Sequence, residues 1–158
     1  MTSDDAAGPR LDDQLCFAIY GASQAMTAAY RDGLAAHGLT YTQYVALLAL
    51  WEDDVVSMRD LCARLHLDSA TLSPLLKRLE ARGLVTRERA AADERTVLVS
   101  CTAQGRALRE PVAAVQAGVE ADTGLTGAEL AELREELHAV AHRLRESRRS
   151  RTASGEVG

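Results

Sequence analysis

The chain has 158 residues, of which 47% are hydrophobic and 26% charged, so its composition is that of one globular domain or of one protomer of an oligomer. With one Phe and one Trp, its core must be built from Ala, Leu and Val, which favours packed helices that pair with a second chain. The net charge of -5 argues against a nucleic-acid-binding protein, because the neutralisation of phosphates supplies much of that affinity, but the distribution of charge matters more than its sum. No signal peptide is visible, and the longest apolar run, at 44–51, is too short to cross a bilayer. We therefore expect a cytoplasmic protein without membrane contact.

Both ends of the chain consist of small and polar residues without hydrophobic periodicity, and we expect residues 1–10 and 148–158 to be flexible. Apolar residues then recur at helical spacing and predict a first long helix from about Asp12 to His37, with Gly38 as its stop. Thr42 is the expected cap of a second helix, which ends near residue 52.

The next segment has the pattern of two short helices joined by a tight turn. Ser57 predicts the start of a helix over 58–65. Asp68 or Ser69 is the expected cap of the following helix, which should end at Gly83.

The second of these helices separates an apolar face from a polar one. Pro74 removes a backbone donor after its first turn and should kink it. Its inward-facing residues are expected to be Leu72, Leu75, Leu76 and Leu79, and its outward-facing residues Thr71, Ser73, Lys77 and Arg78. A second helix that presents hydroxyls and cations is typical of a helix-turn-helix.

Residues 84–102 predict a β-hairpin, or wing, and two helices should follow it. The hairpin has a polar tip that contains Asp93, Glu94 and Arg95, and its second strand alternates Val97 with Val99. Thr102 and Thr126 are expected to cap helices over about 103–121 and 127–146. The predicted fold class is therefore mainly α with a small β wing.

Charge is distributed unevenly along this pattern. Between Lys77 and Arg89 five cations stand against two glutamates, whereas 120–136 is strongly acidic. A solvated helix face explains the cations alone, but less well their coincidence with a helix-turn-helix and a wing. We expect the recognition helix to enter a major groove and Arg95, oriented by Asp93, to enter a minor groove. The predicted DNA-binding residues are Ser69, Thr71, Ser73, Lys77, Arg78, Arg87, Asp93 and Arg95.

The three cysteines, Cys16, Cys62 and Cys101, show no CxxC spacing and predict reduced thiols rather than a zinc site or a disulfide framework. His138 and His142 stand four apart, but no third ligand motif lies nearby. We predict neither a metal nor a cofactor.

Cys16 lies near the start of the first predicted helix, and all four tyrosines follow it within the first 44 residues: Tyr20, Tyr30, Tyr41 and Tyr44. A phenol hydroxyl can donate a hydrogen bond to a thiolate, and the positive end of a helix favours the anion. This grouping favours a thiol that reacts with oxidants. The alternative is that Cys16 is a small buried hydrophobe.

Taken together, the chain resembles the MarR family of winged helix-turn-helix repressors, and within it the organic-hydroperoxide-sensing branch, OhrR. The resemblance covers about residues 11–145 and is carried by the segments LDDQLCFAIY, LTYTQYVALLALWE, LDSATLSPLLKRLEARGLVTRER and DERTVLVS. It implies a homodimer with an N-terminal dimerisation helix at 11–41, a winged helix-turn-helix DNA-binding domain at 42–102 and C-terminal dimerisation helices at 103–147.

The resemblance also implies that Cys16 is the peroxidatic cysteine and that Tyr30 and Tyr41 donate hydrogen bonds to its thiolate. Tyr20 lines the same pocket or is a core tyrosine. Cys16 and Tyr30 are fourteen residues apart on one predicted helix, which separates them by roughly 21 Å. If both serve one site, the tyrosines must come from a second subunit.

No cysteine follows Cys101 that would resolve an oxidised Cys16 as an intersubunit disulfide, and Cys62 and Cys101 both fit structural positions. The one-cysteine route is therefore favoured. In that route the Cys16 sulfenic acid is captured by a low-molecular-weight thiol, by a backbone nitrogen as a sulfenamide, or by further oxidation.

The sequence thus predicts a redox-sensing repressor that is not an enzyme. Reduced, it binds a palindromic operator in double-stranded DNA, and an organic hydroperoxide acting on Cys16 releases it. Two alternatives stay open: a MarR-type repressor controlled by a small phenolic or other anionic ligand in the dimer crevice, and a thiol peroxidase.

Overall fold

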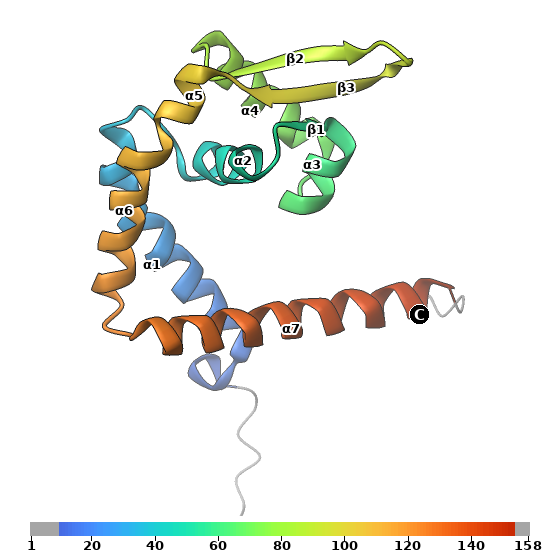
Figure 1. Cartoon of the computed structure of the whole chain (residues 1–158). Helices are drawn as coiled ribbons and strands as arrows, with labels where there is room; N and C mark the ends of the chain where they lie inside the picture. Colours follow the sequence, from blue (N-terminus) through green and yellow to red (C-terminus); the bar gives the residue numbers. More distant parts are fainter. Residues whose placement is uncertain (1–9, 154–158) are drawn as a thin grey trace, which may run out of the picture. The chain divides into compact units, whose positions relative to one another are not determined.

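The computed structural model describes residues 10–153 and divides the chain into two compact units, residues 1–119 and 120–158. The first unit holds helices α1 to α5, most of α6 and a three-stranded antiparallel sheet, and the second is built on α7 (Figure 1). The predicted class, mainly α with a small β wing, is confirmed. The expected flexibility of residues 1–9 and 154–158 lies outside the described residues. Within residues 10–153 no helix is long and apolar enough to span a membrane.

The first predicted helix is interrupted near its start. A short 3₁₀ turn, η1 (Leu11–Asp13), is separated from α1 (Leu15–Ala35) by Gln14, whose backbone is extended. The chain then turns at Gly38, whose φ of +66° lies in the left-handed region that glycine adopts without strain. Only Tyr30 and Leu34 of α1 are buried, so the part of the helix before Tyr30 leaves its side chains open to a partner.

The second helix, α2 (Tyr41–Glu52), begins two residues earlier than predicted, because Thr40 and not Thr42 is its cap. The Thr40 hydroxyl accepts a hydrogen bond from the Gln43 amide, and the Gln43 side chain accepts one from the Thr40 amide. This reciprocal capping box satisfies two donors, which Thr42, already inside the first turn, cannot do.

The two helices of the helix-turn-helix are α3 (Met58–Leu65) and α4 (Ser69–Ala81). Ser57 caps α3, as predicted, by accepting a hydrogen bond from the Asp60 amide at 3.1 Å. Helix α4 continues through Pro74 and ends two residues before Gly83, which has a φ of +70° and lies in the turn that follows.

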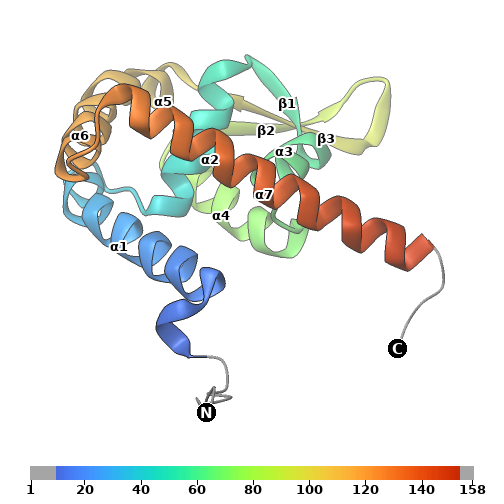
Figure 2. The ribbon, with the colours of Figure 1, turned by 90° about the horizontal axis from the view of Figure 1, so that it is seen from below.

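The sheet contains one strand that the sequence did not reveal. β1 (Val55–Ser57) pairs antiparallel with β3 (Asp93–Cys101), which also pairs with β2 (Val85–Ala90), so the order is β1-β3-β2. Figures 1 and 2 both show the β2–β3 hairpin extending beyond the helices of the first unit. The predicted polar tip is wrong in detail: the turn is Ala91–Ala92, and residues 93–95 already belong to β3.

The helix expected over 103–121 is two helices, α5 (Ala103–Ala107) and α6 (Arg109–Asp122). Thr102 caps α5 as predicted, accepting a hydrogen bond from the Gly105 amide at 3.0 Å. Pro111 explains the break, because it has no N–H to donate to the preceding turn and is tolerated only in the first turn of a new helix.

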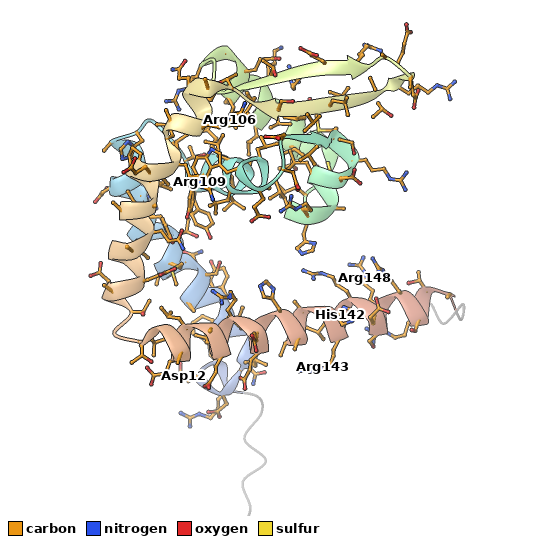
Figure 3. The ribbon with its side chains drawn as sticks, viewed as in Figure 1. Asp12, Arg106, Arg109, His142, Arg143 and Arg148 are labelled. Carbon is orange, nitrogen blue, oxygen red and sulfur yellow. The ribbon has the colours of Figure 1, made fainter. Side chains whose placement is uncertain are left out.

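In the second unit, α7 (Gly127–Ala153) starts at the predicted cap, where Thr126 and Glu129 form a capping box. It runs seven residues beyond the predicted end, so residues 148–153 are helical rather than part of a flexible tail. None of its residues is buried, and Leu133, Leu137 and Leu144 are exposed. Figure 3 shows its basic C-terminal half, with Arg143 and Arg148 among the side chains drawn.

The core of the first unit is a leucine- and valine-rich cluster to which both its helices and its sheet contribute. The four inward-facing leucines predicted on α4 are all buried in it, together with Leu34, Leu47, Leu61, Val99 and Val112. α5 closes one end of this core at Gly105, where an added Cβ would lie 2.1 Å from the Leu84 carbonyl oxygen. Because that neighbour is backbone, only glycine fits this position.

Candidate DNA-binding surface and thiol site

The turn between α3 and α4 is held by backbone geometry and by one carboxylate. His66 adopts a left-handed conformation with φ of 54°, which lets the Leu67 amide donate to the Cys62 carbonyl. The Asp68 carboxylate then accepts a hydrogen bond from the Thr71 amide at 2.7 Å and caps α4. Hydrogen bonds from Thr71 hold the pKa of Asp68 below its usual value. The start of α4 is therefore fixed by a group that is ionised at neutral pH.

The outer face of α4 presents the residues predicted for it. Ser69, Thr71, Lys77 and Arg78 are exposed, and Ser73 is half-buried. Lys77 and Arg78 make no hydrogen bond or salt bridge with any described residue. Their charge is thus available to a partner of opposite sign, such as a phosphate backbone.

The other cations of the basic segment have partners inside the chain. Arg87 contacts Glu80 through both its amide and its guanidinium, the shortest distance being 2.6 Å, and joins the base of the wing to α4. Arg82 donates to the carbonyls of His37 and Gly38, and Arg89 to that of Glu94. Sequence reasoning had predicted Arg87 for the DNA interface, and the structure shows its guanidinium paired with Glu80.

The Glu80–Arg87 pair is electrostatically effective despite its partial exposure. Hydrogen bonding from Arg87 is the main cause of a pKa of Glu80 below the ordinary value. The carboxylate is therefore charged at neutral pH and holds the wing in register with the recognition helix.

In the wing, Asp93 organises the start of β3. Its carboxylate accepts hydrogen bonds from the Arg95 amide and the Thr96 hydroxyl, both at 3.0 Å. Asp93 therefore contacts the backbone of Arg95 and not its guanidinium. The Arg95 side chain is exposed on the projecting hairpin.

The structure places Cys16 as the second residue of α1, with its side chain exposed, so within this chain it is not a core residue. Beside it in sequence, Phe17 and Tyr20 stack with ring centroids 6.5 Å apart. The Tyr20 hydroxyl accepts a hydrogen bond from the Gln24 side chain at 2.6 Å. Tyr20 is 59% exposed and is therefore not a core tyrosine of this chain.

Three of the tyrosines form one cluster at the other end of α1. The Tyr30 ring lies 5.5 Å from that of Tyr41 and 5.3 Å from that of Tyr44, between centroids. Tyr44, which the sequence grouped with Cys16 but to which the resemblance gave no role, donates a hydrogen bond to Gln116 of α6 at 3.1 Å. Its spacing of three from Tyr41, on the same helix face, was the available signal.

Cys16 and this tyrosine cluster do not come together within one chain. Both Cys16 and Tyr30 lie on the uninterrupted helix α1, and fourteen residues at about 1.5 Å each separate them by roughly 21 Å. Assembly of the predicted thiol site therefore requires the tyrosines of a second copy.

The other two thiols are less suited to react. Cys101 is 2% exposed, and burial raises its pKa. Cys62 is half-buried, and desolvation, with a smaller contribution from the Asp68 carboxylate, raises its pKa. Both are largely protonated at neutral pH, and the thiol is a poorer nucleophile than the thiolate. Among residues 10–153 no group of three or more His, Cys, Asp or Glu is placed to hold a metal ion.

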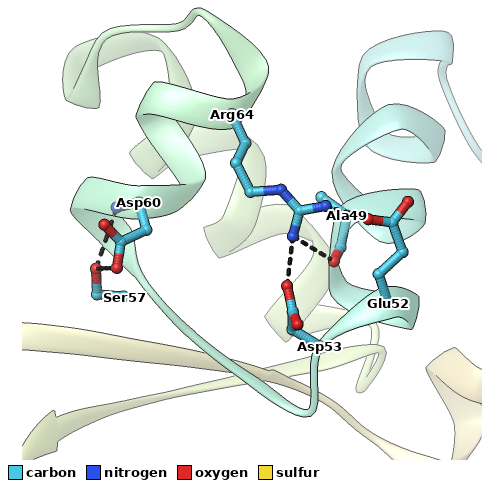
Figure 4. A network of polar contacts seen from close by, with 6 residues as sticks. All are labelled: Ala49, Glu52, Asp53, Ser57, Asp60 and Arg64. Atoms are coloured by element: carbon cyan, nitrogen blue, oxygen red, sulfur yellow. Dashed lines mark hydrogen bonds and ion pairs between the residues drawn. The ribbon is translucent and has the colours of Figure 1, made fainter.

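Helix α2 connects the tyrosine cluster to the DNA-binding elements. Its first turn carries Tyr41 and Tyr44, and its last turn is held to α3 by Arg64 (Figure 4). The Arg64 guanidinium donates to the Ala49 carbonyl at 3.3 Å and to Asp53 at 2.6 Å, and it also contacts Glu52. One short helix therefore carries both the tyrosine cluster and the contact with the helix-turn-helix.

Comparison with known proteins agrees with this arrangement. The family model described as transcriptional regulator SarA/Rot matches residues 29–111. The regulator TtmR of Methylorubrum extorquens is 49% identical over 138 residues, which are 83% of this chain and 71% of that protein. The organic hydroperoxide resistance transcriptional regulator of Bacillus subtilis is 39% identical over 131 residues, 83% of this chain and 89% of that protein.

Solved structures give the same result. Reduced AbfR bound to DNA superposes with a TM-score of 0.70 at 36% identity, covering 85% of this chain and 94% of that one, and overoxidized AbfR bound to DNA matches equally well. A MarR-family regulator from Rhodococcus has a TM-score of 0.77 at 26% identity, covering 85% and 96%. With its helix-turn-helix, its wing and these relatives, the chain belongs to the MarR family of DNA-binding transcriptional regulators and is of the organic-hydroperoxide-resistance type.

Proposed function

We propose that the chain is a cytoplasmic, homodimeric repressor that binds a palindromic operator when Cys16 is reduced and leaves it when an organic hydroperoxide oxidises Cys16. The observation that carries this proposal is the placement of an exposed thiol and a tyrosine cluster at opposite ends of one helix. Two copies of α1 packed antiparallel bring each Cys16 toward the partner's tyrosines.

The surface of α1 supports such pairing. Between Cys16 and Tyr30 it exposes large apolar side chains, among them Phe17, Ile19 and Met26, each 38–39% accessible. Exposed apolar residues on one long helix are stabilised by burial against another apolar surface. We therefore assign residues 11–41 and 103–147 to dimerisation and residues 42–102 to DNA binding.

The chemistry needs one equivalent of oxidant. The Cys16 thiolate attacks the outer peroxide oxygen, the O–O bond breaks, and the alkoxide leaves as the alcohol after taking a proton. Cysteine is oxidised by two electrons to a sulfenic acid and the peroxide is reduced. A low-molecular-weight thiol then condenses with the sulfenic acid to a mixed disulfide and water. Because oxidation ends in a modified sensor and not in turnover, the protein is not an enzyme.

Intact-mass measurement identifies which oxidised form of Cys16 releases the operator. We expect organic hydroperoxide alone to add the mass of one oxygen atom at Cys16. Peroxide together with a small thiol should instead add the mass of that thiol bound in a mixed disulfide. Operator binding and intact mass, measured on the same samples, assign release to one adduct. This matters because overoxidized AbfR is itself found on DNA.

Two other outcomes would support the alternative functions. Release by a small phenolic acid but not by peroxide would support the ligand-controlled repressor, and steady peroxide consumption with added thiol would support a peroxidase.

The phenol donors give a second test. In Tyr30→Phe and Tyr41→Phe the rings remain, so the fold should be unchanged while a hydrogen bond to the Cys16 thiolate is removed. A hydrogen bond to a charged group is worth about 1.5 kcal/mol or more, so alkylation and peroxide reaction of Cys16 should slow about tenfold at neutral pH. Alkylation rates measured against pH report this directly. Identical profiles in both variants and the parent would remove Tyr30 and Tyr41 from the site, and Tyr20→Phe tests whether Tyr20 belongs to it.

A further inference from the structure

A hollow of about 480 Å³ opens between α3, the start of α4 and strand β3. Two guanidinium groups and two uncharged polar side chains line it over an apolar floor that includes Met58 and Val97. The two cations are Arg59 and Arg95, and the uncharged polar residues are Ser69 and Thr96. The thiol of Cys62 also lines the hollow.

The position of the hollow follows from what lies on either side of it. Ser69 is the first residue of the recognition helix, and Arg95 stands on the wing. If α4 enters a major groove while Arg95 enters the adjacent minor groove, one sugar-phosphate strand separates the two grooves and must pass between these residues. That strand then crosses the mouth of the hollow.

Arg59 supplies the charge that such a strand requires. It is exposed in the first turn of α3 and makes no hydrogen bond or salt bridge with any described residue. Its neighbour Asp60 is held at the cap of α3, where its carboxylate accepts a hydrogen bond from Ser57 at 2.7 Å, and it forms no ion pair with Arg59. A guanidinium can bind two phosphate oxygens at once.

We propose that this hollow seats a backbone phosphate of the operator, bound by the Arg59 guanidinium, on the strand that passes between the start of α4 and the wing, so that α3 contacts DNA directly. The proposal rests on the DNA-binding function proposed above. Arg59 contributes affinity and no sequence preference, because phosphates are the same at every base pair.

Salt dependence tests the role of Arg59. Arg59→Gln keeps the length and polarity of the side chain and removes its charge. Because each protomer then neutralises one phosphate fewer, the slope of log K against log salt should become shallower by about 1.8. Operator and unrelated DNA should both be bound more weakly. Arg109→Gln, an exposed arginine of α6 that Figure 3 shows far from the wing tip, is the matched control and should keep the parent slope.

Cys62 provides an independent readout, because its thiol is half-exposed in the wall of the hollow. Alkylation of the whole unmodified protein is followed separately at each cysteine by peptide mass spectrometry. At an operator concentration about 100 times the Kd, labelling of Cys62 should slow by up to about 100-fold, in proportion to the free protein. Inorganic phosphate at matched ionic strength should not protect it.

The outcomes are separable. If the parent binds no DNA, the function proposed above fails with this inference. If the parent binds and Arg59→Gln keeps its salt slope, or Cys62 is labelled equally fast on DNA, only the phosphate seat is wrong. Protection of Cys62 by inorganic phosphate but not by operator would overturn the seat in favour of a small-anion site.

Discussion

Replacing Cys16 by serine is expected to give a repressor that binds its operator as tightly as the parent but no longer responds to organic hydroperoxide. Serine has nearly the same volume and retains a hydroxyl that can meet the partner's tyrosines. It is not ionised at neutral pH and forms no sulfenic acid. The measurement is operator affinity before and after peroxide, and the expected loss of response is complete.

The matched controls are the other two thiols. Cys62→Ser and Cys101→Ser should still be released by peroxide, because burial raises the pKa of both thiols and neither lies by the tyrosine cluster. Two results would contradict the one-cysteine mechanism: release of Cys16→Ser by peroxide, or loss of release in Cys101→Ser.

The second large effect is expected at the wing. Arg95→Ala removes the exposed guanidinium of the projecting hairpin while the Asp93 contacts to the Arg95 backbone remain possible. By analogy with base contacts, the loss is on the order of 1 to 3 kcal/mol per half-site. Since a dimer reads two half-sites, operator affinity should fall at least about 30-fold.

A filter-binding or anisotropy titration at moderate salt measures the effect of Arg95→Ala. Arg109→Ala serves as its control, since it removes the same charge from α6, away from the wing. An Arg95→Ala protein with the parent's affinity would exclude the wing from the interface. Unchanged thermal stability is part of the expected result, because Arg95 is exposed.

Local signals in the sequence were sufficient for the helix-turn-helix and most caps. Ser57, Asp68, Thr102 and Thr126 all cap the predicted helices, because a cap depends on residues within one turn. The buried leucines of α4 followed from their spacing for the same reason. At α2 two threonines competed, and the reciprocal bond with Gln43 decided for Thr40.

Features that depend on distant partners were missed. Strand β1 has only three residues and exists because Val56 pairs with Val99, more than forty positions away. The Glu80–Arg87 pair was not predicted either, because it forms only when folding brings β2 against α4. For the proposed thiol site, the spacing of Cys16 and Tyr30 along one helix already called for a second subunit, and α1 keeps the two residues apart within one chain.

The single tryptophan gives this molecule a built-in optical probe. Trp51, near the end of α2, donates its indole N–H to the Gly105 carbonyl of α5 at 3.0 Å and is half-buried. Its emission therefore reports on the contact between the helix that carries Tyr41 and Tyr44 and the helix that follows the wing. A red shift of that fluorescence on oxidation would show α2 separating from α5, in the natural protein and without any attached label.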